Sequence, residues 1–205
     1  MTITAAPRTA TLADTLWPSG RQGELLRNAT LMVFGFCLLT ASAKIQIPFW
    51  PVPMTMQTFV VLVIGMAYGG RLGAATVLAY LIAGAGGLPV FAGTPERGLG
   101  LAYMVGPTGG FLLGFLLSAA LVGYLAERGW DRTIAGTAGA MVAGNVLILL
   151  MGLGWLSVSL GIPRAIEVGL TPFLVSTVLK TILGIALMPL IWKMVGPREP
   201  AKRIG

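Results

Sequence analysis

The sequence predicts an all-α integral membrane protein in which six transmembrane helices form one bundle with both termini in the cytoplasm. Of its 205 residues, 56% are hydrophobic and 10% are charged, and the apolar residues gather in long runs. A helical span needs about 20 mostly apolar residues, and in lipid every backbone amide must be paired inside the fold. Long unbroken runs therefore favour a helical bundle, and the distribution of basic residues sets its orientation.

One transmembrane domain is expected. A cytoplasmic N-terminal segment covers residues 1–25, the six-span domain covers 26–195, and a cytoplasmic tail covers 196–205. The basic stretch at the start precedes a full-length span and not the short apolar region of a signal peptide, so no removal is expected.

Each span is predicted from an apolar run. The second run is short for a full crossing and is separated from the third only by Arg71, so these two are expected to form a tight helical hairpin. In order, the predicted spans are 26–43, 55–70, 72–91, 106–126, 133–160 and 170–195.

The connections alternate in character. Residues 47–53 read IPFWPVP, and the three prolines predict an extended apolar loop because they forbid a continuous helix. Residues 92–105 are rich in glycine, and residues 161–169 carry a proline and two charges. Both are predicted as loops.

Basic residues mark the cytoplasmic side. Ten of them fall on the N-terminal segment, the second and fourth loops or the C-terminal tail, whereas Lys44, Arg97 and Arg164 fall on the opposite loops. This asymmetry places both termini in the cytoplasm. The formal charge of +7 is thus a mark of topology, and no nucleic-acid partner is expected.

Small residues recur at four-residue spacing in spans four and five. Such stripes let helix backbones approach closely. They are interpreted as packing within the bundle, and the alternative is a docking face for another membrane protein. The stripes are Gly110, Gly114 and Ser118, and Gly136, Ala140 and Gly144.

Lys180 is the most informative residue because it lies near the middle of the sixth span. An unpaired charge there costs about 2.5 to 3.5 kcal/mol on insertion scales. No acidic residue lies inside a predicted span, so a cation facing a cavity and meeting a carboxylate or carbonyl of a ligand is favoured. The alternative is a lysine that reaches the interface or pairs with a polar neighbour.

Other polar side chains at membrane depth fit a pocket with a few polar groups among apolar walls. Each of them alone is better explained by hydrogen bonds between helices or back to its own helix. The polar set is Gln57, Tyr80, Asn145, Ser176, Thr177 and Thr181, and the candidate walls are Trp50, Phe91 and Trp155.

Catalysis is not expected. The chain has no histidine and a single cysteine, Cys37, which excludes a Ser-His-Asp triad, a disulfide within the chain and a zinc cluster. It also lacks a phosphate-binding loop, so ATP hydrolysis would need another protein. No enzyme activity, metal or cofactor is predicted.

Several ordered motifs resemble the BioY family. They are QIP at 46–48 with PVPMTMQT at 51–58, GGLPVFAG at 86–93, and GPTGG at 106–110. The resemblance implies a six-helix S-component of an energy-coupling factor (ECF) transporter in the bacterial cytoplasmic membrane, with biotin as ligand. It also implies a lid loop containing Phe49 and Trp50. The implied partners are a transmembrane coupling protein and cytoplasmic ATPases, besides membrane lipids.

The resemblance also implies site residues. The family's sixth helix commonly reads Asp-x-x-Lys, in which Lys180 matches the lysine and Thr177 stands where the aspartate would be. Lys180 is carried over as a ligand contact, and Thr177 as a hydrogen-bonding candidate that cannot form an ion pair. The other expected substrate contacts are Asn145, Tyr80, Gln57, Arg97 and Phe91.

Alternative functions remain open at this stage. The chain alone could be a slow facilitator of biotin or another small anionic vitamin. It could also be a membrane enzyme acting on a lipid, or a structural partner in a larger complex. The enzyme is disfavoured because the spans hold no carboxylate for metal binding or acid-base chemistry.

Overall fold

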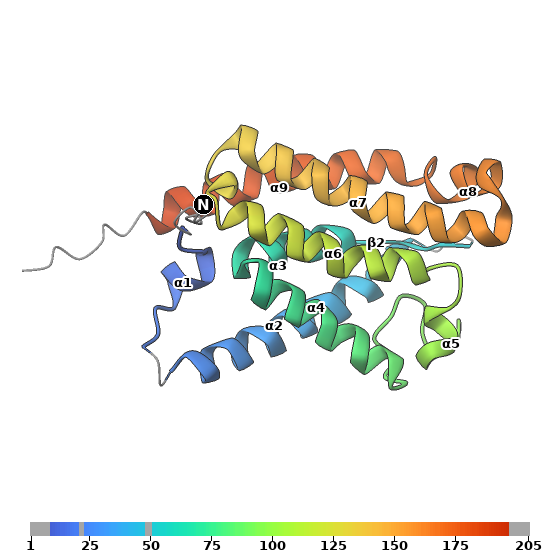
Figure 1. Ribbon diagram of the computed structural model, residues 1–205, viewed down its shortest axis with the longest axis horizontal. Helices are drawn as coiled ribbons and strands as arrows, with labels where there is room; N and C mark the ends of the chain where they lie inside the picture. The colour runs from blue at the N-terminus through green and yellow to red at the C-terminus, as the bar shows by residue number, and fades with distance from the viewer. Residues whose placement is uncertain (1–8, 21–22, 48–50, 197–205) are drawn as a thin grey trace, which may run out of the picture.

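The protein is a bundle of helices with one short pair of strands (Figure 1). The computed structural model describes residues 9–20, 23–47 and 51–196. The elements are α1 (Leu12–Leu16), α2 (Glu24–Lys44), β1 (Gln46–Ile47), β2 (Met54–Thr55), α3 (Gln57–Tyr68), α4 (Gly70–Ala85), α5 (Gly100–Met104), α6 (Gly109–Ala126), the 3-10 helix η1 (Trp130–Arg132), α7 (Ile134–Leu160), α8 (Ile162–Gly169) and α9 (Phe173–Val195).

Four helices of the described chain, α2, α6, α7 and α9, are long and apolar enough to cross a membrane. The chain is therefore a multi-pass membrane protein, as predicted. α3 and α4 are shorter, with 12 and 16 residues, and occupy the positions of the predicted second and third spans. The all-α prediction needs one correction, because Gln46 and Ile47 pair with Thr55 and Met54 in an antiparallel ladder.

The predicted hairpin of the second and third spans is present, with a different turn. Gly69 ends α3 and begins α4 with a φ of +83°, a conformation that glycine adopts without strain. Arg71 therefore lies inside α4 and is not the separator. α4 ends at Ala85, because Gly86 and Gly87 follow, and not at residue 91 as predicted.

Three segments expected to be loops or polar chain contain short helices. α1 lies in the N-terminal segment, where Thr11 and Asp14 form a reciprocal capping box. α5 lies in the glycine-rich connection before α6. α8 begins with Pro163 in its first turn, a position that proline favours.

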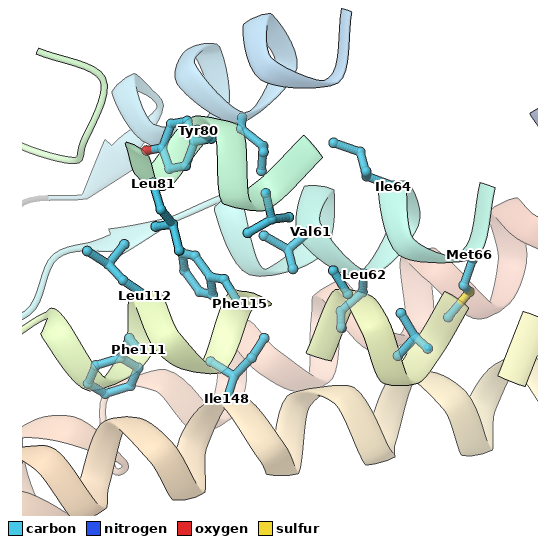
Figure 2. Close-up of a cluster of buried hydrophobic side chains, with 14 of the residues drawn as sticks. Val61, Leu62, Ile64, Met66, Tyr80, Leu81, Phe111, Leu112, Phe115 and Ile148 are labelled. Atoms are coloured by element: carbon cyan, nitrogen blue, oxygen red, sulfur yellow. The ribbon is translucent and has the colours of Figure 1, made fainter. Parts of the chain in front are cut away.

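α6 is the centre of the bundle. It packs against α3 and α4 on one side and α7 on the other (Figure 1). In the most apolar 18-residue stretch of α6, 56% of the residues are buried, whereas the corresponding share for α2 is 17%. Figure 2 shows the core at this centre, where Leu62, Phe115 and Ile148 come from three different helices.

The small-residue stripes pack inside the bundle. The Ser118 hydroxyl of α6 donates to the Gly144 carbonyl oxygen of α7 at 2.9 Å. A Cβ on Gly114 of α6 would lie 2.9 Å from the Ile148 Cα of α7. The interpretation of these residues as packing is confirmed at these contacts.

The two ends of the described chain meet at the same end of the bundle. The Thr9 N–H donates to the Glu127 carbonyl oxygen at 2.8 Å, and Arg132 donates to the Ala10 carbonyl oxygen at 2.9 Å. Near the end of α9, the Trp192 Nε1 donates to Asp131 Oδ2 at 2.7 Å. An even number of crossings is consistent with this arrangement.

Asp131 is a buried carboxylate at this end, in the 3-10 helix between α6 and α7. Its Oδ1 has no hydrogen-bond partner among the described residues. Burial raises the pKa of Asp131, and the hydrogen bond from Trp192 and the charge of Arg132 only partly oppose this. Asp131 therefore takes up a proton more readily in the folded than in the unfolded chain.

Asp131 is expected to make folding stability depend on pH. Its folded pKa exceeds the unfolded value of about 3.9, so stability falls as pH rises from the unfolded to the folded pKa. Thermal unfolding in detergent between pH 4 and 8 should show a shallower slope for Asp131→Asn than for wild type. Glu167→Gln, at an exposed ion pair on α8, is the control expected to follow wild type. Equal slopes for Asp131→Asn and wild type would contradict the assignment.

Candidate functional site

A cavity lies between α3, α6, α7 and α9, closed on one side by the chain around α5. Its space between side chains, opening included, is about 620 Å³. Figure 2 shows Phe111, Leu112 and Phe115 of α6 beside Ile148 of α7, four of its apolar residues. The lining is formed by Val52, Pro53, Thr55, Gln57, Thr58, Ala92, Tyr103, Thr108, Phe111, Leu112, Phe115, Asn145, Ile148, Leu149, Phe173, Thr177 and Lys180.

Lys180 lines this cavity in the second turn of α9. It is 8% exposed, and its Nζ donates to the Thr55 carbonyl oxygen and, at 3.1 Å, to the Thr58 hydroxyl. No carboxylate of the described residues pairs with it. Because an ammonium has three donors, one donor is left after these two neutral acceptors. Lys180 is therefore buried beside a cavity, as predicted, and it also pairs with polar neighbours, as the alternative interpretation expects. Its contact with a ligand stays a prediction.

Asn145 and Gln57 present acceptors to the same cavity. Asn145 uses both hydrogens of its amide nitrogen on protein oxygens, those of Met141 at 3.0 Å and Thr181 at 3.1 Å. Gln57 donates from its amide nitrogen to the Tyr80 hydroxyl at 2.8 Å. The Gln57 Oε1 also accepts from the Thr55 hydroxyl at 3.5 Å. The remaining capacity is therefore the carbonyl oxygen of Asn145, and for Gln57 a second lone pair of Oε1 and the second amide hydrogen.

Thr177 also lines the cavity, one turn before Lys180 on the same face of α9, as its spacing predicted. The floor therefore combines one cationic donor, two amide acceptors and a hydroxyl. We call Gln57, Asn145, Thr177 and Lys180 the polar floor.

Tyr80 and Phe91 lie behind the lining and do not form part of it. The Tyr80 hydroxyl accepts from Gln57 and donates to the Val90 carbonyl oxygen at 2.8 Å. The Phe91 ring stacks on Tyr103, with centroids 5.0 Å apart, and meets Tyr80 edge to face at 5.4 Å. Both residues are fully buried, so they hold Gln57 and Tyr103 in place.

Arg97 lies next to the cavity. Its Nη1 donates to the Pro51 carbonyl oxygen at 3.3 Å, and it borders a separate hollow. Tyr103 and Thr108 line both this hollow and the cavity and form the wall between them, whereas Arg97 lines the hollow alone. The predicted lid residues Phe49 and Trp50 lie outside the described residues.

Tyr103 is the site residue that sequence reasoning missed most clearly. Its ring lines the cavity and its hydroxyl donates to the Ala92 carbonyl oxygen at 2.8 Å. Burial raises the pKa of Tyr103, which keeps the phenol protonated as a donor. Its place just before the GPTGG motif was the available signal.

The aromatic walls were missed as well. Phe111, Phe115 and Phe173 line the cavity, but phenylalanine in an apolar helix has no signal that separates a site from a core. The predicted wall residue Trp155 is instead half-exposed and donates to the Gly106 carbonyl oxygen at 3.0 Å. Of the other polar candidates, Thr181 bonds to Asn145, and Ser176 faces a different hollow.

The arrangement suits reversible binding. The described residues hold no cluster of three or more His, Cys, Asp or Glu side chains that could hold a metal ion. An apolar cavity with a few fixed polar groups is the usual form of a small-molecule site. Fold and cavity together define a multi-pass membrane protein whose helix bundle encloses an apolar cavity with a few polar groups.

The chain belongs to the BioY family, whose sequence model matches residues 10–197. This confirms the family predicted from the motifs. A probable biotin transporter BioY of Pyrococcus horikoshii is 34% identical over 154 residues, which cover 75% of this chain and 89% of the relative. Biotin transporter BioY of Thermotoga maritima is 38% identical, with coverage of 72% and 85%. Biotin transporter BioY2 of Lactococcus lactis is 32% identical, with coverage of 82% and 93%.

A solved structure has the same fold. It is the crystal structure of the S-component for biotin from an ECF-type ABC transporter, with a TM-score of 0.71 and 23% identity. The match covers 85% of this chain and 95% of that chain. The relatives are named as transporters, in accord with the prediction of a transporter and not an enzyme.

Proposed function

We propose that this BioY-family chain binds biotin and is the substrate-binding subunit of an ATP-driven ECF-type vitamin transporter. The observation that carries the proposal is the polar floor, with the buried Lys180 seated on neutral oxygens inside an otherwise apolar cavity. The names of the relatives, all biotin transporters, support the choice of ligand.

The polar floor is complementary to the ureido ring of biotin. A cyclic urea has one strong acceptor oxygen between two N–H donors. Lys180 supplies the donor for that oxygen, and the carbonyl oxygens of Gln57 and Asn145 accept from the two N–H groups. Thr177 adds a hydroxyl that can serve either role. The ring system is then enclosed by Tyr103, Phe111, Phe115 and Phe173.

The valerate chain extends from the floor toward the wall shared with the second hollow. There Arg97 is proposed to bind the carboxylate of biotin, because the planar guanidinium of arginine matches the geometry of a carboxylate. Tyr80 and Phe91, predicted as contacts, are proposed to act through Gln57 and Tyr103. Phe49 and Trp50 remain the predicted lid.

We propose six membrane crossings: the four long helices and the two shorter helices α3 and α4. Both ends of the chain lie in the cytoplasm, which the distribution of basic residues supports. The segment boundaries 1–25, 26–195 and 196–205 stay as predicted. The membrane is the cytoplasmic membrane of a bacterium.

The proposed partners are a transmembrane coupling protein and cytoplasmic ATPase subunits, besides the surrounding lipids. The chain has no phosphate-binding loop of its own, so ATP hydrolysis is assigned to those partners.

The test is calorimetric titration of the purified protein in detergent with biotin and with biotin methyl ester. Wild type is expected to bind both, the ester more weakly. Arg97→Gln should weaken biotin binding by about tenfold, as for loss of a partly buried charge contact of roughly 1.4 kcal/mol, and leave binding of the ester unchanged. Absence of biotin binding by wild type would reject the function. An equal loss for both ligands in Arg97→Gln would reject the placement of the carboxylate.

A further inference from the structure

A further hollow, distinct from the one that Arg97 borders, lies beside Lys180. Its space between α9 and the strand pair, opening included, is about 450 Å³. Thr55 and Lys180 line both this hollow and the cavity, so the two spaces are separated by these residues. We call it the side groove, and its lining is Ile45, Gln46, Met54, Thr55, Met56, Ser176 and Lys180.

Lys180 lies on α9 between the residues that line the cavity and those that line the side groove. Thr177, three residues earlier, lines the cavity, whereas Ser176, four residues earlier, lines the side groove. Both positions lie within one helical turn of Lys180. The lysine side chain, a flexible stem of four methylenes, therefore reaches either space from a fixed backbone.

Few side-chain hydrogen bonds hold the wall between the cavity and the side groove. Among the described residues, the only side-chain hydrogen bonds from the first half of α9 to the strand pair and α3 are those of Lys180 to Thr55 and Thr58. On its other side α9 is fastened to α7 by the bond from Asn145 to Thr181. Releasing the Lys180 ammonium from these two acceptors therefore removes every side-chain hydrogen bond that the described residues of this half of α9 make to the strand pair and α3.

The groove suits passage of an amphipathic molecule. Met54 and Met56 give it unbranched walls that adapt to a passing shape. Gln46, Ser176 and Lys180 give it polar groups. It lies at the level where α2 ends and α9 begins, at the end of the bundle opposite to the chain ends (Figure 1).

We propose that the side groove is the route by which the ligand reaches the cavity, with Lys180 and Thr55 as its inner gate. This rests on the proposed function, since the ligand is taken to be biotin. Lys180 meets the acceptor oxygen of the ligand in the groove, breaks its hydrogen bonds to Thr55 and Thr58 while the ligand passes, and then resumes its place in the polar floor. A group placed in the groove then slows binding and release alike without changing the bound state.

The experiment blocks the groove after folding. In a Cys37→Ala background, which removes the only native cysteine, Ser176→Cys is purified and alkylated with N-ethylmaleimide. Val175→Cys is the matched control, because Val175 is the neighbouring residue and is 70% exposed on the outer face of α9. Rates of biotin binding and release are measured by stopped flow and the equilibrium constant by calorimetry, before and after alkylation.

Alkylation at position 176 is expected to lower the association and dissociation rate constants together by about tenfold, with Kd unchanged, while alkylation at 175 changes neither. Unchanged rates after complete alkylation at 176 would overturn the route. A weaker Kd with faster release would also overturn it, since Ser176 would then belong to the binding site. Failure of the unmodified protein to bind biotin would instead reject the proposed function.

Discussion

Replacing Lys180 by methionine is expected to weaken biotin binding by well over tenfold. Truncating one partner of a buried, hydrogen-bonded charge contact costs about 2 to 5 kcal/mol. Methionine keeps most of the volume of the lysine stem, so the cavity is not enlarged, and Lys180→Ala should lose at least as much. The affinity is measured by calorimetry on the purified variants in detergent.

Two comparisons make this result specific. Lys193→Met removes an exposed lysine from the last turn of the same helix and should bind as wild type does. Because Lys180 is assigned to the ureido oxygen, Lys180→Met should weaken biotin and its methyl ester by the same factor. A loss confined to biotin would move Lys180 to the carboxylate, and unchanged affinity would make it a structural residue.

Replacing Gly123 by leucine is expected to prevent stable folding. A Cβ at this position would meet the Gly70 backbone nitrogen as well as the Gly70 Cα at 2.6 Å, and backbone cannot move aside as a side chain can. Overpacking typically destabilises a protein by about 1 to 3 kcal/mol. Because the neighbour here is backbone, we expect the loss of stability in Gly123→Leu to reach or exceed the upper value. The measure is thermal unfolding and the yield of monodisperse protein in detergent, with Gly123→Ala as a milder step.

Gly154→Ala is the matched control for that experiment. Gly154 also lies in a transmembrane helix, but nothing lies within 4 Å of a Cβ built there. Alanine favours a helix over glycine by up to about 1 kcal/mol, so this variant should be as stable as wild type or more so. Equal loss at 123 and 154 would show that the glycines matter for helix flexibility and not for close packing.

The long helices were predictable because their apolar runs have the length that a bilayer demands. Lys180 was predictable for the related reason that a charge inside such a run needs an explanation. Gly69 was missed as the turn because nothing in the run of glycines 69–70 marks which one takes a positive φ. The short helices α1, α5 and α8 were missed because each is stabilised by its own caps or by contacts with the bundle.

The cavity walls could not be predicted from sequence. Tyr103 reaches the site from a connection whose path depends on the stacking of Phe91, which in turn rests on Tyr80. Tyr80 and Phe91 were predicted as contacts because their types suit a pocket, and the fold places them one layer behind it. Burial alone does not distinguish a wall from the layer that supports it.

The hydrogen bonds that fix the amide nitrogens of Asn145 and Gln57 have a consequence for selectivity among biotin analogues. With those nitrogens turned to the protein, the floor discriminates at the ring: a guanidine in place of the urea offers no oxygen to Lys180 and brings a second positive charge beside it. 2-Iminobiotin should therefore be rejected. The sulfur of biotin has no proposed contact with the polar floor. Desthiobiotin, which keeps the urea, should therefore compete with biotin for the same cavity.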